Sequence, residues 1–222
     1  MSKYSTNIEK QINFLKEVLR IQTSSKILDL GCGQGAHLVE IQKLAPDSIG
    51  CDNINQSNLT NFKQIDIFNE SLGSKNYFDG IYCLAPYFGK NWWNIECLLQ
   101  NISDSLKTDG LFVLDLFNFN SLKIGKKIQR HMYQNGSKSV MIEDGIRELD
   151  RYVATRREID TDWTVNETNI VWRIFDRQEL TDLCGRFGMV MIGDYAGFDS
   201  KTKANWEPNI NEQRILTVFK KI

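Results

Sequence analysis

Apolar residues in the first half of the chain alternate between short continuous runs and helical stripes. The short runs predict strands at 26–30, 48–52, 62–68, 77–84 and 111–117. The helical stripes predict helices over 7–22, from the glycine-rich stretch after the first strand to about residue 44, over 55–62 and over 91–107. Strands that alternate with helices predict an α/β fold whose mostly parallel sheet is covered on both faces.

This alternation stops after the fifth predicted strand. Residues 121–138 are basic and weakly patterned, and residues 139–175 predict two or three antiparallel strands with a hairpin turn at 160–162. The stretch 149–159 places Leu149, Val153 and Ile159 on one face and Asp150, Tyr152, Arg156 and Glu158 on the other. We interpret 121–175 as an insertion, either a lid or a dimerisation surface, within a single domain spanning 1–222.

Regular order resumes at Asp176. Asp176 and Glu179 have the spacing of a capping box, which predicts a helix that ends at Phe187-Gly188. Residues 189–196 and 214–220 predict two last strands without a helix between them, and therefore an antiparallel pair at a sheet edge. The predicted fold class is α/β: a doubly wound, seven-stranded, mostly parallel sheet with an antiparallel last strand, plus an antiparallel β insertion after the fifth strand.

Composition narrows the class of protein. The 222 residues carry a formal net charge of -1, and 41% are hydrophobic, so nothing indicates a nucleic-acid or membrane partner. The polar start of the chain lacks the apolar core of a secretion signal, which favours the cytoplasm. Five cysteines without a Cys-x-x-Cys pair indicate reduced thiols, and two histidines make a metal site improbable.

The stretch from Asp29 to Gly35 is the strongest candidate for a binding site. Its three alternating glycines, Gly31, Gly33 and Gly35, follow a strand and open a helix, so that a ligand can approach bare backbone and the helix N-terminus. Asp52 ends the second predicted strand 21 positions after Gly31, where a carboxylate accepts ribose hydroxyls. The turn and this acid together indicate a nucleoside ligand.

Asp66, near the end of the third predicted strand, lies where an adenine amino group is expected, with Ile67 as apolar cover for the base. Gly31, Gly33 and Ala36 also satisfy the relaxed dinucleotide pattern G-x-G-x-x-G/A. Asp29 before the turn would repel a pyrophosphate, however, and the chain has no separate substrate domain. The pattern therefore favours a cofactor with one nucleoside and a positively charged amino-acid end.

Asp29-x-Gly31-x-Gly33-x-Gly35, Asp52, Asp66 and the run 78–81 together resemble the successive motifs of class I S-adenosylmethionine-dependent methyltransferases. The resemblance covers roughly residues 20–118. It implies S-adenosylmethionine as cofactor, with Asp29 near its ammonium group. The other implied contacts are Gly31, Cys32, Gly33 and Gly35 with the methionine part, Asp52 and Asn53 with the ribose, Asp66 and Ile67 with adenine, Cys83 and Leu84 beside the methionine amino group, and Tyr4 folded over the cofactor.

The segment after the fourth strand bears on the methyl acceptor. Leu84 stands where enzymes that methylate amide or base nitrogens have a polar residue, which disfavours that class. The stretch 85–89 resembles the aromatic-glycine loop of small-molecule enzymes, including amino-sugar N,N-dimethyltransferases, and the insertion after strand 5 resembles theirs. Tyr87 is a candidate catalytic residue in this loop and His131 a candidate base, whereas His37 is interpreted as helix packing.

The predicted function is methyl transfer to a nitrogen or oxygen of a small molecule, by in-line displacement that depends mainly on positioning. Two alternatives stay open: a methyltransferase acting on RNA or protein, and a cofactor-binding protein without turnover. The insertion contains Arg147, Arg151, Arg156, Arg157 and Arg173. These either grip an anionic acceptor or, as we favour, form a solvated face balanced by nearby acids. The oligomeric expectation is a monomer or a homodimer.

Overall fold

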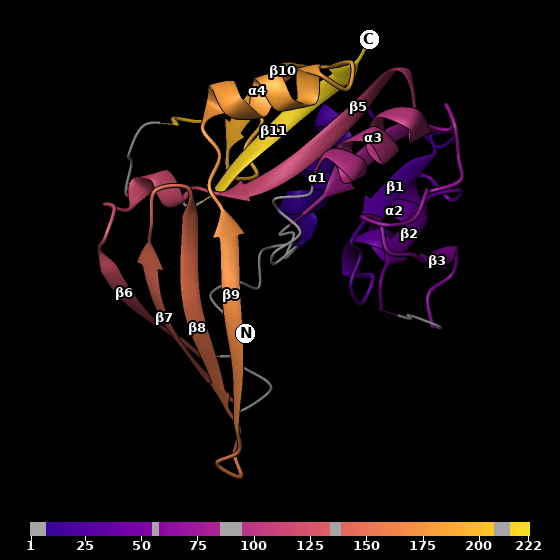
Figure 1. The fold of residues 1–222 in the computed structure, drawn as a ribbon. Helices are drawn as coiled ribbons and strands as arrows, with labels where there is room; N and C mark the ends of the chain where they lie inside the picture. The colour runs from indigo at the N-terminus through magenta and orange to yellow at the C-terminus, as the bar shows by residue number, and fades with distance from the viewer. Residues whose placement is uncertain (1–7, 55–57, 85–94, 134–138, 207–213) are drawn as a thin grey trace.

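The chain folds into one mixed sheet covered by helices and a second, smaller sheet that extends from it (Figure 1). The computed structural model describes residues 8–54, 58–84, 95–133, 139–206 and 214–222. The first sheet has seven strands in the order β10-β11-β5-β4-β1-β2-β3. Their bounds are β1 Ile27–Leu30, β2 Ile49–Asp52, β3 Phe62–Gln64, β4 Phe78–Cys83, β5 Leu106–Phe117, β10 Met189–Ala196 and β11 Arg214–Lys221.

Strand direction in this sheet confirms the predicted fold class. The pairs β5–β4, β4–β1, β1–β2 and β2–β3 are parallel, so their carboxyl ends meet at one edge. β11 lies between β10 and β5 and is antiparallel to both. The last two strands therefore form the predicted antiparallel pair at one edge of the sheet.

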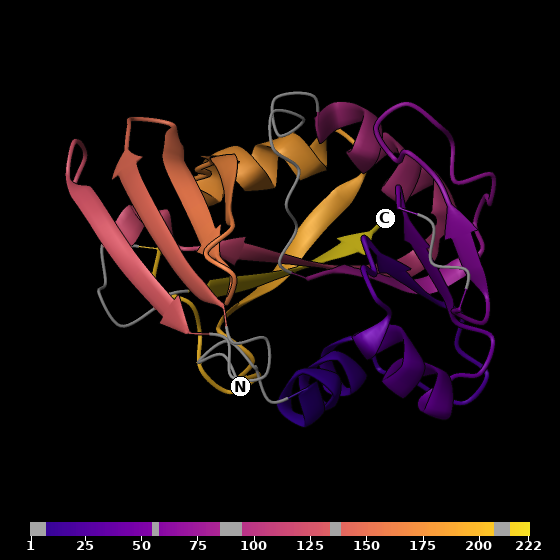
Figure 2. The same cartoon turned by 90° about the horizontal axis from the view of Figure 1, so that it is seen from below.

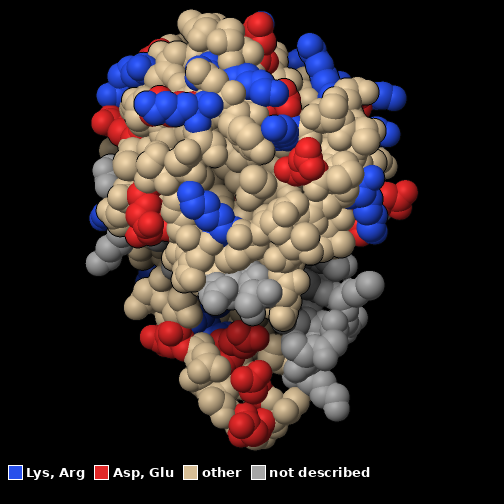
Figure 3. Space-filling view, turned by 90° about the vertical axis from the view of Figure 1, so that its right-hand side faces the viewer, with Lys and Arg blue, Asp and Glu red and all other residues tan. Residues whose placement is uncertain are grey.

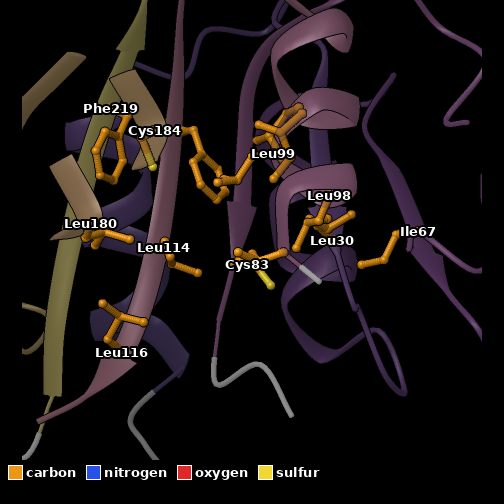
Figure 4. Packing of buried hydrophobic residues seen from close by; sticks show 14 of the residues in the cluster. Leu30, Ile67, Cys83, Leu98, Leu99, Leu114, Leu116, Leu180, Cys184 and Phe219 are labelled. Atoms are coloured by element: carbon orange, nitrogen blue, oxygen red, sulfur yellow. The ribbon is translucent and has the colours of Figure 1, made fainter. Parts of the chain in front are cut away.

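Helices cover both faces of the sheet. α1 (Ile8–Val18) and α2 (Ala36–Leu44) pack on one face, where Leu15 and Ile41 join a core cluster with Ile27. α3 (Ile95–Ser105) and α4 (Arg177–Gly185) cover the other face. Figure 4 shows this second core, in which Leu98, Leu99, Leu180 and Cys184 of the helices meet Leu30, Cys83, Leu114 and Phe219 of the strands.

The start of α4 is capped by Asp176, as predicted, but only one of the two hydrogen bonds of a capping box is formed. The Asp176 carboxylate accepts the backbone N–H of Glu179 at 2.7 Å, which satisfies one of the free amides of the first turn. The Glu179 carboxylate pairs instead with Arg173, at the end of the second sheet. This ion pair ties α4 to the second sheet.

The second sheet has four antiparallel strands: three lie within 139–175, as predicted, and one that was not predicted precedes them. Their bounds are β6 Lys127–Tyr133, β7 Val140–Arg147, β8 Arg151–Ile159 and β9 Val165–Arg173, in sequential order. β6 was missed because three consecutive polar residues, Gln129, Arg130 and His131, interrupt the alternation that indicates a strand. The hairpin at 160–162 is confirmed by the hydrogen bond from the Asp160 N–H to the Thr164 carbonyl, at 3.0 Å.

Aromatic packing fixes the second sheet to the end of β5. The short 3-10 helix η2 (Phe119–Ser121) follows β5, and the Phe119 ring stacks on Tyr152 of β8 with centroids 4.3 Å apart. Phe117 meets Trp172 of β9 edge to face at 4.9 Å. Seen from below in Figure 2, the second sheet stands beside the first as a separate wall, joined to it through β5 and α4.

Some predicted boundaries were wrong. β3 ends at Gln64, not residue 68, so Asp66 and Ile67 lie in the turn that follows it. β5 begins at Leu106, and α3 ends one residue earlier. The described part of 55–62 contains turns and the start of β3, not a helix. No helix among the described residues is long and apolar enough to cross a membrane.

Candidate cofactor-binding site

The glycine turn leaves β1 at the carboxyl edge of the first sheet. Gly31, Gly33 and Gly35 have φ values of +73°, +51° and +78°, a left-handed backbone conformation that residues other than glycine rarely adopt. The space beside Gly31 and Gly33, where a Cβ atom would lie, is open, whereas a Cβ at Gly35 would collide with Leu59. The first two glycines therefore expose bare backbone, and the third allows a side chain to cover the turn.

Asp52 is bonded to this turn, as the predicted site requires. One of its carboxylate oxygens accepts the N–H of Gly33 at 2.9 Å, and the other accepts the N–H of Ile54 at 3.1 Å. Because β2 lies next to β1, the carboxyl end of β2 delivers Asp52 to the glycine turn. Asn53 follows it, and its carbonyl accepts the side-chain amide of Gln64 at 3.0 Å.

Asp66 and Ile67 lie one strand further out, in the turn after β3. The Asp66 carboxylate accepts the N–H of Phe68 at 3.0 Å and the side-chain amide of Asn69 at 2.7 Å. Ile67 is buried, and its carbonyl accepts the side-chain amide of Asn101 at 3.0 Å. That amide also reaches the Glu70 carbonyl, at 2.9 Å.

Asn101 was not singled out from the sequence. It lies in the apolar stripe of α3 and is only 9% exposed. A buried amide within a helix requires partners, and here the partners are the carbonyls of the turn that holds Asp66 and Ile67. A polar residue on the core face of a predicted helix was the signal that could have identified it.

Asp29 is the most perturbed acid of the site. It is 4% exposed, and burial raises its pKa from 3.8 to about 7, with the nearby Asp52 charge adding to the rise. The Tyr82 hydroxyl and the backbone N–H of Leu38, in the first turn of α2, lower this pKa in part. Asp29 therefore titrates near neutral pH, unlike an ordinary surface carboxyl.

The cysteines at this edge are not nucleophiles. Burial raises the pKa of Cys32 and of Cys51 to about 12, and the Cys83 pKa also lies well above its usual value. Their thiols stay protonated at neutral pH.

The structure also places the predicted residues Cys83 and Leu84. Cys83 is the last residue of β4, and Leu84 follows it and packs, partly buried, against the core cluster under α1. Both predicted residues therefore lie at the carboxyl edge of the sheet.

A buried ion pair at the same edge was also missed. Arg214, at the start of β11, donates from Nε to the Asp115 carboxylate of β5 at 2.9 Å, and its NH2 group pairs with the other oxygen. The guanidinium lies between the rings of Phe117 and Phe198, at 5.2 and 5.3 Å from their centroids. Asp115 within an otherwise apolar strand was the available signal.

His37 packs as interpreted. Its Nε2 lies 2.5 Å from the side-chain oxygen of Gln11 on α1, so it joins the first two helices. Burial and the nearby Arg214 charge lower the pKa of His37, which keeps the ring neutral at physiological pH.

Of the remaining predicted residues that the structure describes, His131 is not brought to the turn. His131 is exposed on β6 and its ring contacts the side chain of Gln129 at 3.1 Å, so its position gives a catalytic role no support. Tyr4 and Tyr87, with the whole loop 85–89, lie outside the described residues. No group of acids, histidines and cysteines that could hold a metal ion is found among the described residues.

The five arginines of the insertion are each engaged within the protein. Arg147 donates to the carbonyls of Asn120 and Leu122, which anchors the insertion to η2. The other four form ion pairs: Arg151 with Glu148, Arg156 with Glu143, Arg157 with Asp144 and Glu167, and Arg173 with Glu179. The interpretation as a face balanced by nearby acids is supported.

Comparison with known proteins extends this picture. No family model matches the chain, and no curated protein matches its sequence significantly. Solved structures do match along nearly its whole length. An S-adenosylmethionine-dependent methyltransferase from Clostridium acetobutylicum superposes with a TM-score of 0.77 at 15% identity, covering 98% of this chain and 93% of that one.

Two further matches are to sugar-modifying enzymes. The sugar N-methyltransferase KedS8 from Streptoalloteichus superposes with a TM-score of 0.69 at 17% identity, covering 98% of this chain and 89% of that one. The amino pentose methyltransferase CalS10 from Micromonospora echinaspora has a TM-score of 0.66 at 18% identity, with 96% and 92% covered. The chain therefore has the Rossmann-like fold of these S-adenosylmethionine-dependent methyltransferases.

Proposed function

We propose that this protein transfers a methyl group from S-adenosylmethionine to a nitrogen or oxygen of a small molecule. The observation that carries the proposal is the glycine turn, which leaves backbone open at Gly31 and Gly33 while Asp52 is bonded to Gly33 and Asp29 is buried behind it. This arrangement stands at the carboxyl edge of a methyltransferase fold, where ligands of open α/β sheets bind.

The residues of this edge fit each part of the cofactor. Asp52 would accept the ribose hydroxyls, with Asn53 beside it, and Asp66 with Ile67 would bind the adenine. The buried Asp29 would face the methionine ammonium, together with the backbone from Gly31 to Gly35 and that of Cys83 and Leu84. Tyr4 and Tyr87 remain proposed contacts from the parts of the chain outside the described residues.

The cofactor supplies an activated methyl group on its sulfonium, so the protein needs mainly to align an acceptor and exclude water. The chain offers a rigid frame for this purpose. Asn101 holds the turn of Asp66, and the Asp115–Arg214 ion pair fixes β11 to β5 at the edge. No described residue needs to act as a nucleophile in this proposal.

A small acceptor is supported by the surface charge. On the face seen in Figure 3, basic side chains over the upper part are interspersed with acidic ones, and acidic ones gather at the lower end, where the hairpin between β8 and β9 lies. A stripe of basic residues, as RNA-binding proteins have, is not visible on this face. The sugar N-methyltransferases with the same fold also act on small molecules.

We propose that the insertion 121–175 is a lid over the acceptor or a surface between two copies, within a single domain. We further propose that the protein works in the cytoplasm as a monomer or homodimer. Size-exclusion chromatography with light scattering separates the two oligomeric states.

Calorimetric titration tests the shared premise. We expect S-adenosylmethionine and S-adenosylhomocysteine to bind the unmodified protein. Asp52→Ala should weaken binding by about a hundredfold, because hydrogen bonds to a charged acceptor contribute about 1.5–3 kcal/mol each. Asp47→Ala removes an exposed acid before β2 and should leave the affinity unchanged. Absence of binding to the unmodified protein would refute the proposal.

Turnover is tested separately with a panel of small amines, amino sugars and phenols, and with total RNA as the competing acceptor class. Mass spectrometry detects a gain of one methyl group. Methylation confined to RNA would overturn the small-molecule proposal, and binding without methylation of any class would favour a cofactor-binding protein without turnover.

A further inference from the structure

Two buried polar groups beneath the glycine turn lack ordinary hydrogen-bond partners. Asp29 on β1 and Tyr82 on β4 stand opposite each other in the parallel pairing of these strands, and they are 4% and 0% exposed. One Asp29 oxygen, Oδ2, and the Tyr82 hydroxyl form no hydrogen bond of standard geometry with the described part of the chain. Buried polar atoms of this kind usually indicate a missing ligand, water or proton.

The two groups are nevertheless close enough to influence each other. The Tyr82 hydroxyl lowers the pKa of Asp29, and Asp29 together with burial raises the pKa of Tyr82 well above its usual value. The tyrosine therefore stays protonated at all physiological pH values, and its hydroxyl can donate to an ionised Asp29 carboxylate. A donor beside a carboxyl favours its ionised form, so Tyr82 opposes part of the effect of burial on Asp29.

The other described groups that act on Asp29 do not supply a cation. The titratable side chains whose charges couple with Asp29 are Tyr82 and Cys83 on β4, Cys51 and Asp52 on β2, and Cys32 in the glycine turn. From α2 comes the backbone N–H of Leu38. With respect to the residues that the structure describes, a carboxylate at Asp29 would thus be buried without a positive partner, which is unfavourable.

We propose that Asp29 holds a proton in the free protein and releases it when a ligand with an ammonium group binds above the glycine turn, with Tyr82 as the positioning residue that orients the carboxylate. The inference rests on the proposed function, in which the amino-acid end of the cofactor supplies this ammonium group. The O–H bond of the Asp29 carboxyl breaks, its electron pair stays on the carboxylate, and the proton passes to the buffer.

Cofactor affinity is therefore linked to pH. At low pH the bound proton must be displaced, so affinity falls as pH decreases below the titration of Asp29. With that titration near neutrality in the free protein, affinity for S-adenosylhomocysteine should be about tenfold lower at pH 6 than at pH 8. Nearly one proton should be released per ligand at pH 6, and almost none at pH 8.

Calorimetry in two buffers of different ionisation enthalpy measures this proton count. The probes are S-adenosylhomocysteine and adenosine, which lacks the ammonium group and should release no proton. Asp29→Asn should abolish proton release and flatten the pH dependence. Tyr82→Phe should shift the pH dependence of binding to higher pH, so that proton release persists at pH 8. Tyr77→Phe, which changes a tyrosine next to the start of β4, is the control and should behave as the unmodified protein.

The outcomes separate this inference from the proposed function. If S-adenosylhomocysteine binds but releases no more protons than adenosine at pH 6, or if Asp29→Asn retains the release, the proton-coupled pair is refuted and cofactor binding stands. If Tyr82→Phe leaves the pH profile unchanged, the role of Tyr82 is refuted. If neither ligand binds, the proposed function fails and this inference with it. Circular dichroism of each variant verifies that it is folded.

Discussion

The molecule contains two buried pairs of an acid and a tyrosine, and they are completed in opposite ways. In the second sheet, the Tyr152 hydroxyl donates to Glu143 at 2.9 Å, and Arg156 donates to the same carboxylate at 2.7 and 3.1 Å. In the first sheet, the pair of Asp29 and Tyr82 is as deeply buried, but no cation among the described residues faces it, and neither Asp29 Oδ2 nor the Tyr82 hydroxyl forms a hydrogen bond of standard geometry with them.

The glycines beside the two pairs show the same contrast. A Cβ at Gly145 would collide with the Tyr152 ring, so the space beside this glycine is occupied by another side chain of the protein. At Gly31 and Gly33 the corresponding space is open. A polar pair satisfied from within serves the fold, whereas an incomplete pair beside open backbone is arranged for a ligand. Whether the protein itself supplies the hydrogen-bond partners therefore distinguishes a buried acid that stabilises the fold from one that binds a ligand, which the residue type alone does not.

The largest expected effect concerns the incomplete pair. Folding raises the Asp29 pKa from 3.8 to about 7, so the folded protein binds this proton more tightly than the unfolded chain. The stabilisation is present near pH 4 and is lost as pH rises through 7. Relative to Asp29→Asn, the unmodified protein should lose about 3 kcal/mol of unfolding free energy between pH 5 and pH 8, measured by urea unfolding. If the difference in unfolding free energy between the two proteins is the same at pH 5 and pH 8, Asp29 does not bind a proton on folding and the contrast between the two pairs is refuted.

Removing the acid of the complete pair should act on stability alone. Glu143→Ala leaves Arg156 and Tyr152 without their acceptor, which should cost about 2 kcal/mol because Arg156 is partly exposed. Cofactor affinity measured by calorimetry on the folded variant should not change. Glu148→Ala, which breaks the exposed pair with Arg151, is the matched control and should cost about 0.5 kcal/mol or less. Loss of cofactor binding in the Glu143 variant would instead place this pair in the site.

The glycines allow a smaller and more local test. Gly33→Ala and Gly188→Ala both place a side chain at positive φ in open space, so each should cost about 1 kcal/mol of stability. Only Gly33→Ala should also weaken S-adenosylhomocysteine binding, by about tenfold or more, because its methyl group enters the proposed ligand space. Equal affinity of the two variants would argue against a ligand at the turn.

The smallest difference is expected between the two tyrosines. Tyr152→Phe removes a hydrogen bond to a charged acceptor and should cost about 1.5 kcal/mol. Tyr82→Phe removes a hydroxyl without a standard partner, and at pH 6, where Asp29 is mostly protonated, it should cost about 0.5 kcal/mol or less. Thermal unfolding of both variants at pH 6 measures the two costs, and equal losses would mean that the Tyr82 hydroxyl is satisfied after all.

The first sheet was predictable because its signals are local. Continuous apolar runs, the glycine turn and the acids that follow strands each depend on neighbours in sequence, and Asp29, Asp52 and the glycines lie where the pattern placed them. The boundary of β3 was less predictable, since it is a three-residue strand in which two residues are exposed. Short exposed strands carry little periodicity.

The second sheet was less predictable because its packing is decided by tertiary contacts. In β8, the sequence places the aliphatic residues Val153 and Ile159 on one face, but the buried residues Tyr152 and Ala154 lie on the other face. Stacking of Phe119 on Tyr152 and the pairing of Arg156 with Glu143 make that face the inner one. Residues separated by tens of positions decide such contacts, and periodicity does not report them.

The position of β11 has a consequence for how the protein is made on the ribosome. β5 receives its outer neighbour only when β11 has been synthesised, and the Thr217 hydroxyl that bonds the Leu114 carbonyl comes 103 residues later. Until then β5 is an open, largely apolar strand edge. The second sheet, whose strands pair with their immediate neighbours in sequence, can form during this interval. Synthesis therefore leaves the central sheet exposed to non-native strand pairing until the final strand closes it.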